Sequence, residues 1–197
     1  MNTTELVKRF ILQAFDPDMV MEQHKTDDIS KRFRLHSCTK YQELEMPGPA
    51  AEGRLWVALQ AMVHCYHYHP EKGSKCGMQI WKKRQFIFCP SSLLEDEARS
   101  TYISPLEHGP ILSIGYPDLR DLMGRYHQVD TAIRSFALKQ EHYYRKKSQL
   151  LNACPLERVR QFRAQNQAFI NCSTQEVQAM HVNMSLRSYI NQVNKLK

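Results

Sequence analysis

The polar side chains of the C-terminal segment have the chemistry of nucleic-acid recognition. Arginine, asparagine and glutamine make paired hydrogen bonds to base edges, and serine and lysine suit phosphate oxygens. In LRSYINQVNKLK such residues alternate at helical spacing with an apolar stripe of Leu186, Ile190, Val193 and Leu196, partly joined by Tyr189. The candidate DNA-binding residues are Ser185, Arg187, Ser188, Asn191, Gln192 and Lys195.

Positive charge is concentrated in the same part of the chain. The 67 residues from Thr131 to Lys197 hold eleven Lys or Arg and three Asp or Glu, a net charge of +8. The first 130 residues hold sixteen and seventeen, a net charge of −1. A basic helical end on a near-neutral body predicts a polyanion partner, most simply double-stranded DNA. The alternative is an ordinary solvated basic helix face.

The segment VHCYHYHP has the spacing of a partial metal site. On a strand, Cys65, His67 and His69 share one face, and the intervening residues share the other. Two histidines at positions i and i+2 supply only part of a coordination shell, and the sequence assigns no further ligand. We therefore predict no metal, and interpret the segment as a strand with one exposed polar-aromatic face.

Composition and missing motifs narrow the class of protein. A chain of 197 residues with 42% hydrophobic residues is long and apolar enough to bury a core. It has no apolar run of the roughly 20 residues that cross a bilayer, and no signal-peptide pattern. Its six cysteines show no CxxC spacing, which favours reduced thiols. We expect a cytoplasmic protein without membrane contact. No P-loop, G-x-G-x-x-G, GxSxG or HExxH motif occurs, so we predict that it is not an enzyme.

The elements that position these residues fall into two kinds. Thr3 or Thr4 begins a predicted helix through about Ala14, with Leu6, Phe10, Ile11 and Ala14 on one face. From about Lys31 to Ile114, short strands alternate with turn residues and no helices intervene, which predicts an antiparallel sandwich or roll. After Pro117 the pattern is helical, and Pro155 ends one helix and begins another.

One of these predicted helices is unusually long, because Val129 to Leu151 contains neither Gly nor Pro. Its stripe at spacings of three and four suits either packing against its own domain or a parallel two-helix contact between two copies. We favour the homodimer, since a helix so long would otherwise leave part of its stripe exposed. The predicted dimerisation residues are Val129, Ile133, Phe136, Gln140, Tyr143 and Leu150.

The order of these elements resembles the Crp/Fnr superfamily of bacterial transcription regulators. The resemblance is carried by LWVALQAMVHCYHYHPEKGSK, by FIFCPSSLLEDEARSTYISPLEHGPILSIGYPDL and by ERVRQFRAQNQAFINCSTQEVQAM. It implies an α+β fold with N-terminal helices, a cyclic-nucleotide-binding-like antiparallel β-roll (a double-stranded β-helix or jelly roll), a long connecting helix and a small helical winged-helix-like or helix-turn-helix domain. It divides the chain into residues 1–128 (sensor roll), 129–152 (dimerisation helix) and 153–197 (DNA-binding domain).

The resemblance also implies an effector site. In the family a Gly-Glu pair binds the ribose, and an Arg-Ser pair some ten residues later binds the cyclic phosphate. Arg99 and Ser100 match the second pair, whereas Cys89 stands near the first and cannot replace a carboxylate. The candidate effector residues are thus Arg99, Ser100 and Cys89, and the alternative for Arg99 is a solvated ion pair with Glu95, Asp96 or Glu97. The ligand stays unassigned: the incomplete cassette favours another small anion, or no ligand, over cyclic AMP.

Two departures from the family concern the helix-turn-helix. Ser173 or Thr174 is expected to cap its first helix and Ser185 its second. Val177 and His181 stand where relatives have a small residue and a glycine. The predicted function is a Crp/Fnr-type transcription regulator that binds DNA as a homodimer. The alternative is a non-DNA-binding cyclic-nucleotide-binding-like module that acts through a small anionic ligand or a protein partner.

Overall fold

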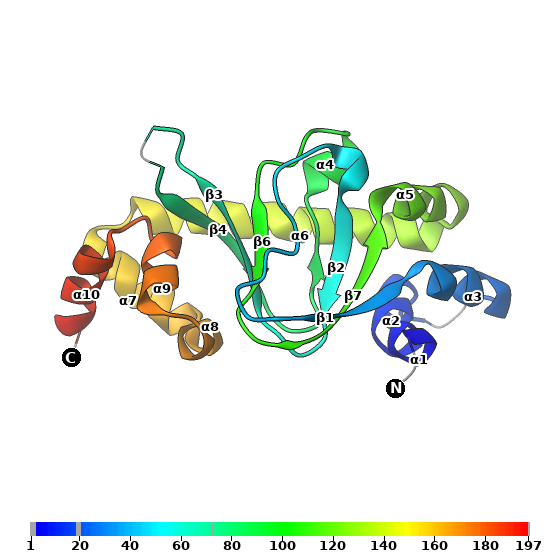
Figure 1. The fold of residues 1–197 in the computed structure, drawn as a ribbon, viewed down its shortest axis with the longest axis horizontal. Coiled ribbons are helices and arrows are strands. Elements are labelled where there is room, and N and C mark those ends of the chain that lie inside the picture. Colours follow the sequence, from blue (N-terminus) through cyan, green and yellow to red (C-terminus); the bar gives the residue numbers. More distant parts are fainter. Residues whose placement is uncertain (1–2, 19–20, 72, 197) are drawn as a thin grey trace.

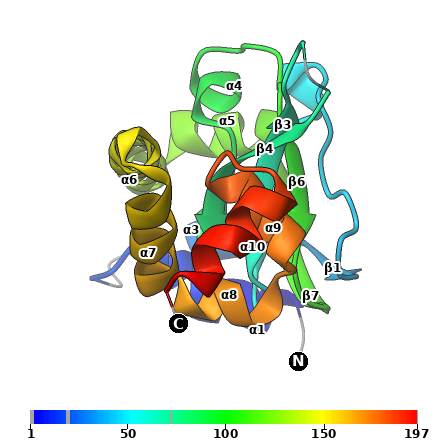
Figure 2. The same ribbon diagram turned by 90° about the vertical axis from the view of Figure 1, so that its left-hand side faces the viewer.

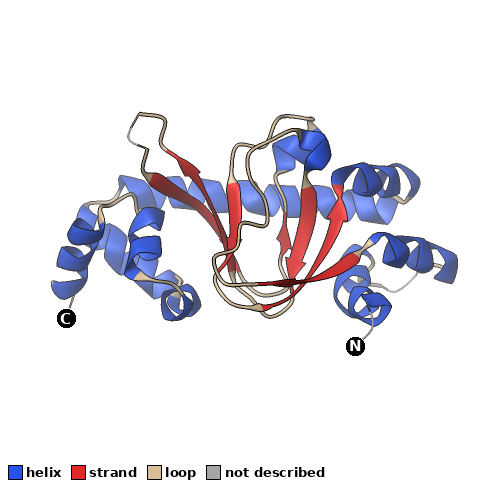
Figure 3. Ribbon diagram, in the orientation of Figure 1, coloured by secondary structure: helices blue, strands red, loops and turns tan. Residues whose placement is uncertain are grey.

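A computed structural model describes residues 3–18, 21–71 and 73–196. Two antiparallel sheets form its centre (Figures 1 and 3). The first has the strand order β1 (Arg34–Cys38), β7 (Gly109–Gly115), β2 (Arg54–Ala58) and β5 (Phe86–Ile87). The second has the order β4 (Lys75–Trp81), β3 (Val63–Tyr68) and β6 (Tyr102–Pro105). Non-sequential neighbours of this kind confirm the predicted roll and the α+β class.

The two sheets are held together by side chains between them. Trp56 of β2, Cys65 of β3 and Ile111 of β7 belong to one buried apolar cluster. Strand β2 pairs with β7 from Arg54↔Gly115 to Ala58↔Ile111, which fixes the face that each residue presents to the cluster.

The N-terminal helices cover one end of the roll. They comprise α1 (Thr3–Val7), a π-helical segment (Lys8–Leu12), α2 (Gln13–Phe15) and α3 (Gln23–Arg32). Leu6, Ile11 and Phe15 are buried in a cluster that they share with α5 (Tyr116–Arg125) and the start of α6. The apolar face predicted for the first helix is therefore confirmed.

The remaining helices form a small unit at the other end, reached by one long helix. Helix α6 (His127–Asn152) has 26 residues and passes behind the roll (Figure 1). At a rise of 1.5 Å per residue it is about 39 Å long. The helices α7 (Pro155–Gln165), α8 (Gln167–Cys172), α9 (Gln175–His181) and α10 (Leu186–Asn194) gather at its far end (Figure 2). The short α4 (Pro90–Leu94) follows β5.

The stripe of α6 packs largely within one chain, which corrects part of the predicted dimer contact. Val129 and Ile133 are fully buried in the N-terminal cluster, and the Phe136 ring stacks on Phe86 with centroids 4.5 Å apart. Gln140 is only 4% exposed. The remaining two, Tyr143 and Leu150, are partly covered by the same chain. Of the two alternatives, the buried Val129, Ile133 and Gln140 follow the intramolecular one. A dimer contact through the half-buried Phe136, Tyr143 and Leu150 stays a prediction.

The C-terminal unit shares a core with the roll. Met62, Ile80 and Leu106 of the roll join one buried cluster with residues of the C-terminal helices, among them Val159, Phe162, Phe169, Ala179, Val182 and Tyr189. Nothing tests the predicted division at residues 128 and 152, which stays a prediction. Within the described part of the chain, no helix is long and apolar enough to span a membrane, and no His, Cys, Asp and Glu residues group as a metal site.

Candidate effector pocket and candidate DNA-binding helix

Two of the three candidate effector residues border a cavity of about 660 Å³ between the roll and α6, which we call the cassette cavity. Cys89 and Ser100 line it from the roll side, and Ala137, Leu138 and Tyr144 line it from α6. Its size suits a small organic molecule. The structure thus brings Cys89 and Ser100 together as predicted neighbours of one cavity.

Arg99 lies outside this cavity, which corrects its predicted role. Its side chain is 7% exposed, with Nη1 3.7 Å from the Glu45 carboxylate and Nη2 3.6 Å from that of Glu52. Its Nε donates to the carbonyl of Pro49 at 3.2 Å. Residues 99 and 100 point to opposite sides in extended chain, so Ser100 faces the cavity and Arg99 turns away. The alternative of a solvated pair with Glu95, Asp96 or Glu97 is wrong as well.

The partners of Arg99 explain why the match to the family motif predicted the wrong role for it. Glu45 is buried, and burial raises the pKa of its carboxyl group despite the opposing Arg54 backbone N–H and the Arg99 guanidinium. A buried carboxylate needs a paired charge, and Arg99 supplies it. Gly48 leaves room, because a Cβ there would lie 2.9 Å from Nη2 of Arg99. Arg99 is therefore a structural residue that joins the 45–52 segment to the roll.

The cassette cavity itself has little to hold an anion. Its charged lining residues are Glu95, Glu141 and Arg134, and Arg134 already pairs with Asp130 at 2.9 Å. The hydroxyl of Ser100 and the thiol of Cys89 are neutral hydrogen-bonding groups. Most of the remaining wall is apolar, from Met78, Trp81 and Leu138 among others. This chemistry suits a neutral or weakly polar molecule better than a cyclic phosphate.

The C-terminal helices form a capped helix–turn–helix. Thr174 caps α9 by accepting from the N–H of Val177 at 3.3 Å, and Ser185 caps α10 by accepting from the N–H of Ser188 at 3.2 Å. Both caps were predicted from the sequence. The residue with positive φ in the turn is Asn183, at φ 51°, and not His181. Asparagine tolerates this backbone conformation, so the turn forms without a glycine.

Helix α10 lies at one end of the molecule, facing the viewer in Figure 2. Arg187, Ser188, Asn191 and Lys195 are exposed, and Gln192 is half-buried. The predicted inward stripe needs one correction: Leu186 is 43% exposed and Leu196 is 37% exposed, whereas Tyr189 is fully buried. The helix is thus rotated so that Tyr189 and Val193 face the shared core.

Much of the basic charge of the C-terminal region is used inside the chain. Arg158 donates to the carbonyls of Ala153 and Val182, and Arg163 donates to the Tyr189 hydroxyl. Arg145 and Arg160 pair with Glu141 and Glu157 on their own helices. Among the described basic residues after Thr131, those without an ion pair or buried hydrogen bond are Lys139, Lys146, Arg187 and Lys195. The surface available to a polyanion is smaller than the net charge indicated.

A buried polar cluster fixes α9 on the roll. Lys147 of α6 donates to the carbonyls of Gly77 and Met78, and its Nζ lies 3.3 Å from Nδ1 of His181. Nε2 of His181 lies 3.2 Å from Nδ1 of His64. Since an ammonium group only donates, Nδ1 of His181 must accept, and its Nε2–H then donates to His64. Both histidines are consequently neutral in this arrangement.

This cluster corrects the interpretation of the histidine-rich strand. His64 is 2% exposed beneath His181 of α9, and Tyr66 is 4% exposed with its ring stacked on Tyr102, so most of the predicted exposed polar-aromatic face is buried. Tyr68, on the same face, stays 44% exposed. A bulge between Cys65 and Tyr66 also shifts the register. Burial lowers the pKa of His64 to about 3, helped by Lys75 and Lys147, and it lowers that of His181 with Lys147 and His64. The sequence signal for this contact was a histidine in place of the turn glycine.

Comparisons with known proteins were made by sequence and by fold. No protein-family model matches the sequence, and no curated protein matches it. Solved structures do match. FixK2 from Bradyrhizobium japonicum has a TM-score of 0.71 at 12% identity, covering 83% of this chain and 84% of its own. The c-di-GMP responsive global regulator CLP from Xanthomonas campestris has a TM-score of 0.69 at 13% identity, and the match covers 89% of this chain and 91% of CLP. A protein from Eubacterium rectale described as a transcriptional regulator of the Crp/Fnr family has a TM-score of 0.77 at 10% identity, and the match covers 93% of this chain and 87% of that protein. The chain therefore has the fold of the Crp/Fnr transcription regulators.

Proposed function

We propose that the chain is a DNA-binding transcription regulator of the Crp/Fnr type. The observation that carries this proposal is the capped α9–turn–α10 unit, whose exposed face holds Arg187, Ser188, Asn191 and Lys195. As a recognition helix, α10 would lie in a major groove with its N-terminal residues nearest the bases. The roll would not use cyclic AMP in the usual way, because Arg99 is engaged with Glu45 and Glu52.

The proposed regulator acts as a homodimer through α6 around Leu138, at the open mouth of the cassette cavity. Leu138 is 66% exposed there, the most exposed large apolar side chain among the described residues. A second α6 packed at this position would place two copies of α10 on one side of the assembly. Two-fold dimers of this kind bind half-sites about one helical turn, or about 34 Å, apart.

Fluorescence anisotropy of the purified protein on fragments of its own genome, across a salt series, tests DNA binding. Lys195 from two copies gives about two phosphate contacts, so log K should fall with log salt with a slope of about −2. Arg187→Ala should reduce discrimination between fragments by about 1–3 kcal/mol. Lys195→Ala should weaken binding to all fragments alike.

The matched control is Lys31→Ala, in the last turn of α3 at the opposite end of the molecule (Figure 1). It should leave the affinity and the salt slope unchanged. Equal affinities for wild type, Arg187→Ala and Lys195→Ala would contradict the placement of α10 in the groove.

A second function is favoured by the fixed position of α9. The Lys147–His181–His64 cluster and the shared core hold the helical unit on the roll, and most nearby cations have partners within the chain. A module of this kind would act through a small ligand or a protein partner. Weak, fragment-independent DNA binding would favour this alternative over the regulator.

A further inference from the structure

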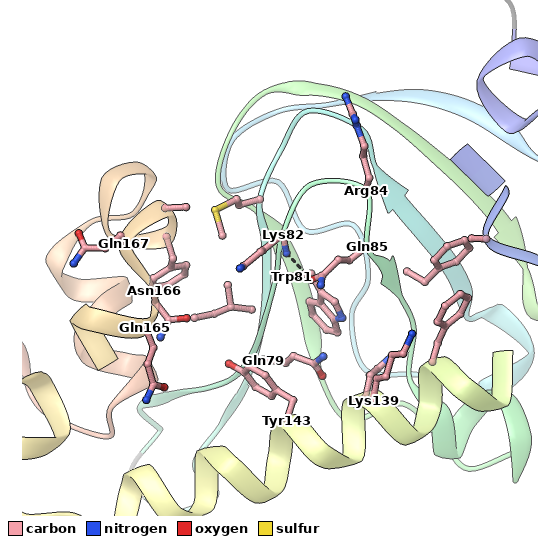
Figure 4. Close-up of a pocket in the computed structure, with 18 of the residues that line it drawn as sticks. Gln79, Trp81, Lys82, Arg84, Gln85, Lys139, Tyr143, Gln165, Asn166 and Gln167 are labelled. Atoms are coloured by element: carbon pink, nitrogen blue, oxygen red, sulfur yellow. Dashed lines mark hydrogen bonds between the residues drawn. The ribbon is translucent and has the colours of Figure 1, made fainter. Parts of the chain in front are cut away.

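A second cavity lies on a different face of α6 from the cassette cavity. It has a volume of about 610 Å³, is open on one side and is bordered by β4, the turn after it, α6 and the α7–α8 junction (Figure 4). The residues of α6 that line it are Phe136, Lys139, Gln140 and Tyr143, whereas the cassette cavity uses Arg134, Ala137, Leu138, Glu141 and Tyr144. Trp81 is the one described residue that borders both. The cavity is therefore a separate space, walled by both the roll and the C-terminal helices.

Two buried glutamines line this cavity with side-chain atoms that have no hydrogen-bond partner among the described residues. Gln140 is 4% exposed, and both its Oε1 and its Nε2 are unpaired among the described residues. Gln79, also 4% exposed, has an unpaired Oε1 and lies between Trp81 and Tyr143 (Figure 4). Burying an amide without a partner costs about 1–3 kcal/mol. A molecule in the cavity that offers both donors and acceptors would recover this cost.

All the charged residues that line this cavity are basic. Its lining includes Lys82, Arg84 and Lys139, and no Asp or Glu among the described residues. None of these three cations forms an ion pair within the described chain. Lys139 instead lies over the Phe136 ring, with Nζ 5.4 Å from its centroid. An anionic ligand would therefore meet cations here that the cassette cavity does not offer.

The apolar part of the wall is largely aromatic. Trp81, Phe86, Phe136 and Tyr143 all border the space. Flat aromatic walls favour a flat ring, by offset stacking or edge contacts. Amides that read a hydrogen-bonding edge, cations and aromatic surfaces thus meet in one cavity from three different elements.

We propose that this cavity binds a nucleotide-sized organic anion with a flat, hydrogen-bonding ring. The ring edge pairs with Gln79 and Gln140, and the anionic group lies toward Lys139. The site does not depend on DNA binding by α10. Because residues 164–169 form one wall and β4 another, the ligand contacts the roll and the helical unit together. Its binding therefore favours the arrangement in which these two parts are docked.

Calorimetric titration with the four ribonucleoside 5′-monophosphates tests the site. At least one should bind, and the matching uncharged nucleoside should bind at least about tenfold more weakly, since a tenfold change corresponds to about 1.4 kcal/mol. Inorganic phosphate alone should bind more weakly than that nucleotide. Absence of binding by all four up to about 1 mM would overturn the proposal.

Variants of residues in the two cavities show which cavity binds the nucleotide. Gln140→Leu should weaken binding more than about tenfold while keeping or raising the melting temperature, because it removes two unpaired buried atoms. Lys139→Gln alters an exposed side chain, so it tests the charge even if Gln140→Leu fails to fold. Ser100→Ala, which changes only the cassette cavity, should leave the affinity unchanged.

Fluorescence gives an independent readout. The chain has two tryptophans, so Trp56→Phe leaves Trp81 as the sole indole, and its emission should change as the nucleotide binds. Trp81 also borders the cassette cavity, and the variants therefore decide between the two. Loss of binding in Ser100→Ala with normal binding in Gln140→Leu and Lys139→Gln would put the ligand in the cassette cavity and overturn the proposal.

Discussion

At the scale of single residues, Gly77 decides whether α9 lies on the roll. A Cβ at this position would lie 2.6 Å from Cγ and Nδ1 of the His181 ring, closer than packed atoms approach. Gly77→Ala should therefore push α9 away and lower stability by about 1–3 kcal/mol, the usual cost of overpacking. The measurements are thermal unfolding and amide hydrogen exchange, in which α9 should lose protection before the strands do.

The matched control is Gly124→Ala in α5, where an added Cβ has no atom within 4 Å. This substitution should stabilise the helix by about 0.4–1 kcal/mol, because alanine loses less backbone entropy on folding than glycine. If both alanine variants unfold at the wild-type temperature with unchanged exchange in α9, the contact between Gly77 and His181 does not hold the unit in place.

The same scale shows which residues were predictable from local sequence. Thr174 and Ser185 were predicted as caps because a cap depends only on the N–H groups two or three positions later. Arg99 was misplaced because Glu45 and Glu52, its partners, lie about fifty positions earlier in the chain. A half-matched motif indicates a cavity, but long-range charges decide which of its side chains face that cavity.

At the scale of elements, α6 has two faces with different uses. Its length and its Gly-free, Pro-free interior followed from the sequence, and so did its start and end within two residues. The partner of its apolar stripe did not follow, because the same spacing suits a roll or a second helix. The polar position in that stripe, Gln140, was the signal that part of it borders a cavity.

The exposed Leu138 of α6 gives a prediction about assembly. Leu138→Glu should convert a dimer of the 23.1 kDa chain into monomers, because it places a charge at the centre of the proposed helix–helix contact. Sedimentation equilibrium over a concentration series measures the change. Met46→Glu, which replaces another exposed apolar side chain off the helix, should leave the dimer intact. A wild-type protein that sediments as a monomer at all concentrations would contradict the dimer.

At the scale of the whole molecule, the helical unit and the roll meet through both an apolar core and a buried polar chain. Met62, Ile80 and Leu106 supply the roll side of the core. The polar chain runs from Lys147 through His181 to His64, with Lys75 facing His64 and the Tyr66 ring 5.7 Å from it. The charged groups beside the two histidines, Lys147 and Lys75, are cations, so a proton added to either histidine would be repelled.

Stability should therefore fall in acid. Unfolded histidine has a pKa near 6.5, whereas burial lowers that of His64 to about 3 and that of His181 below its ordinary value. The unfolded chain then binds more protons at these histidines below pH 6.5, so the stability that their neutral forms contribute is full above that pH and is lost as pH decreases toward 3. His64 alone accounts for up to about 1.4 kcal/mol per pH unit. Lys147, whose pKa burial lowers to about 8, stays charged throughout this window.

Urea unfolding between pH 8 and pH 5 measures this dependence. His64→Asn should lower stability at neutral pH but reduce the loss between pH 6.5 and pH 5, because one of the two neutral buried imidazoles is gone while an amide oxygen can still accept from His181. His142→Asn, at an exposed position of α6, should keep the wild-type slope. Equal slopes for wild type and His64→Asn would contradict this prediction, because the buried His64 would then not cause the loss of stability in acid.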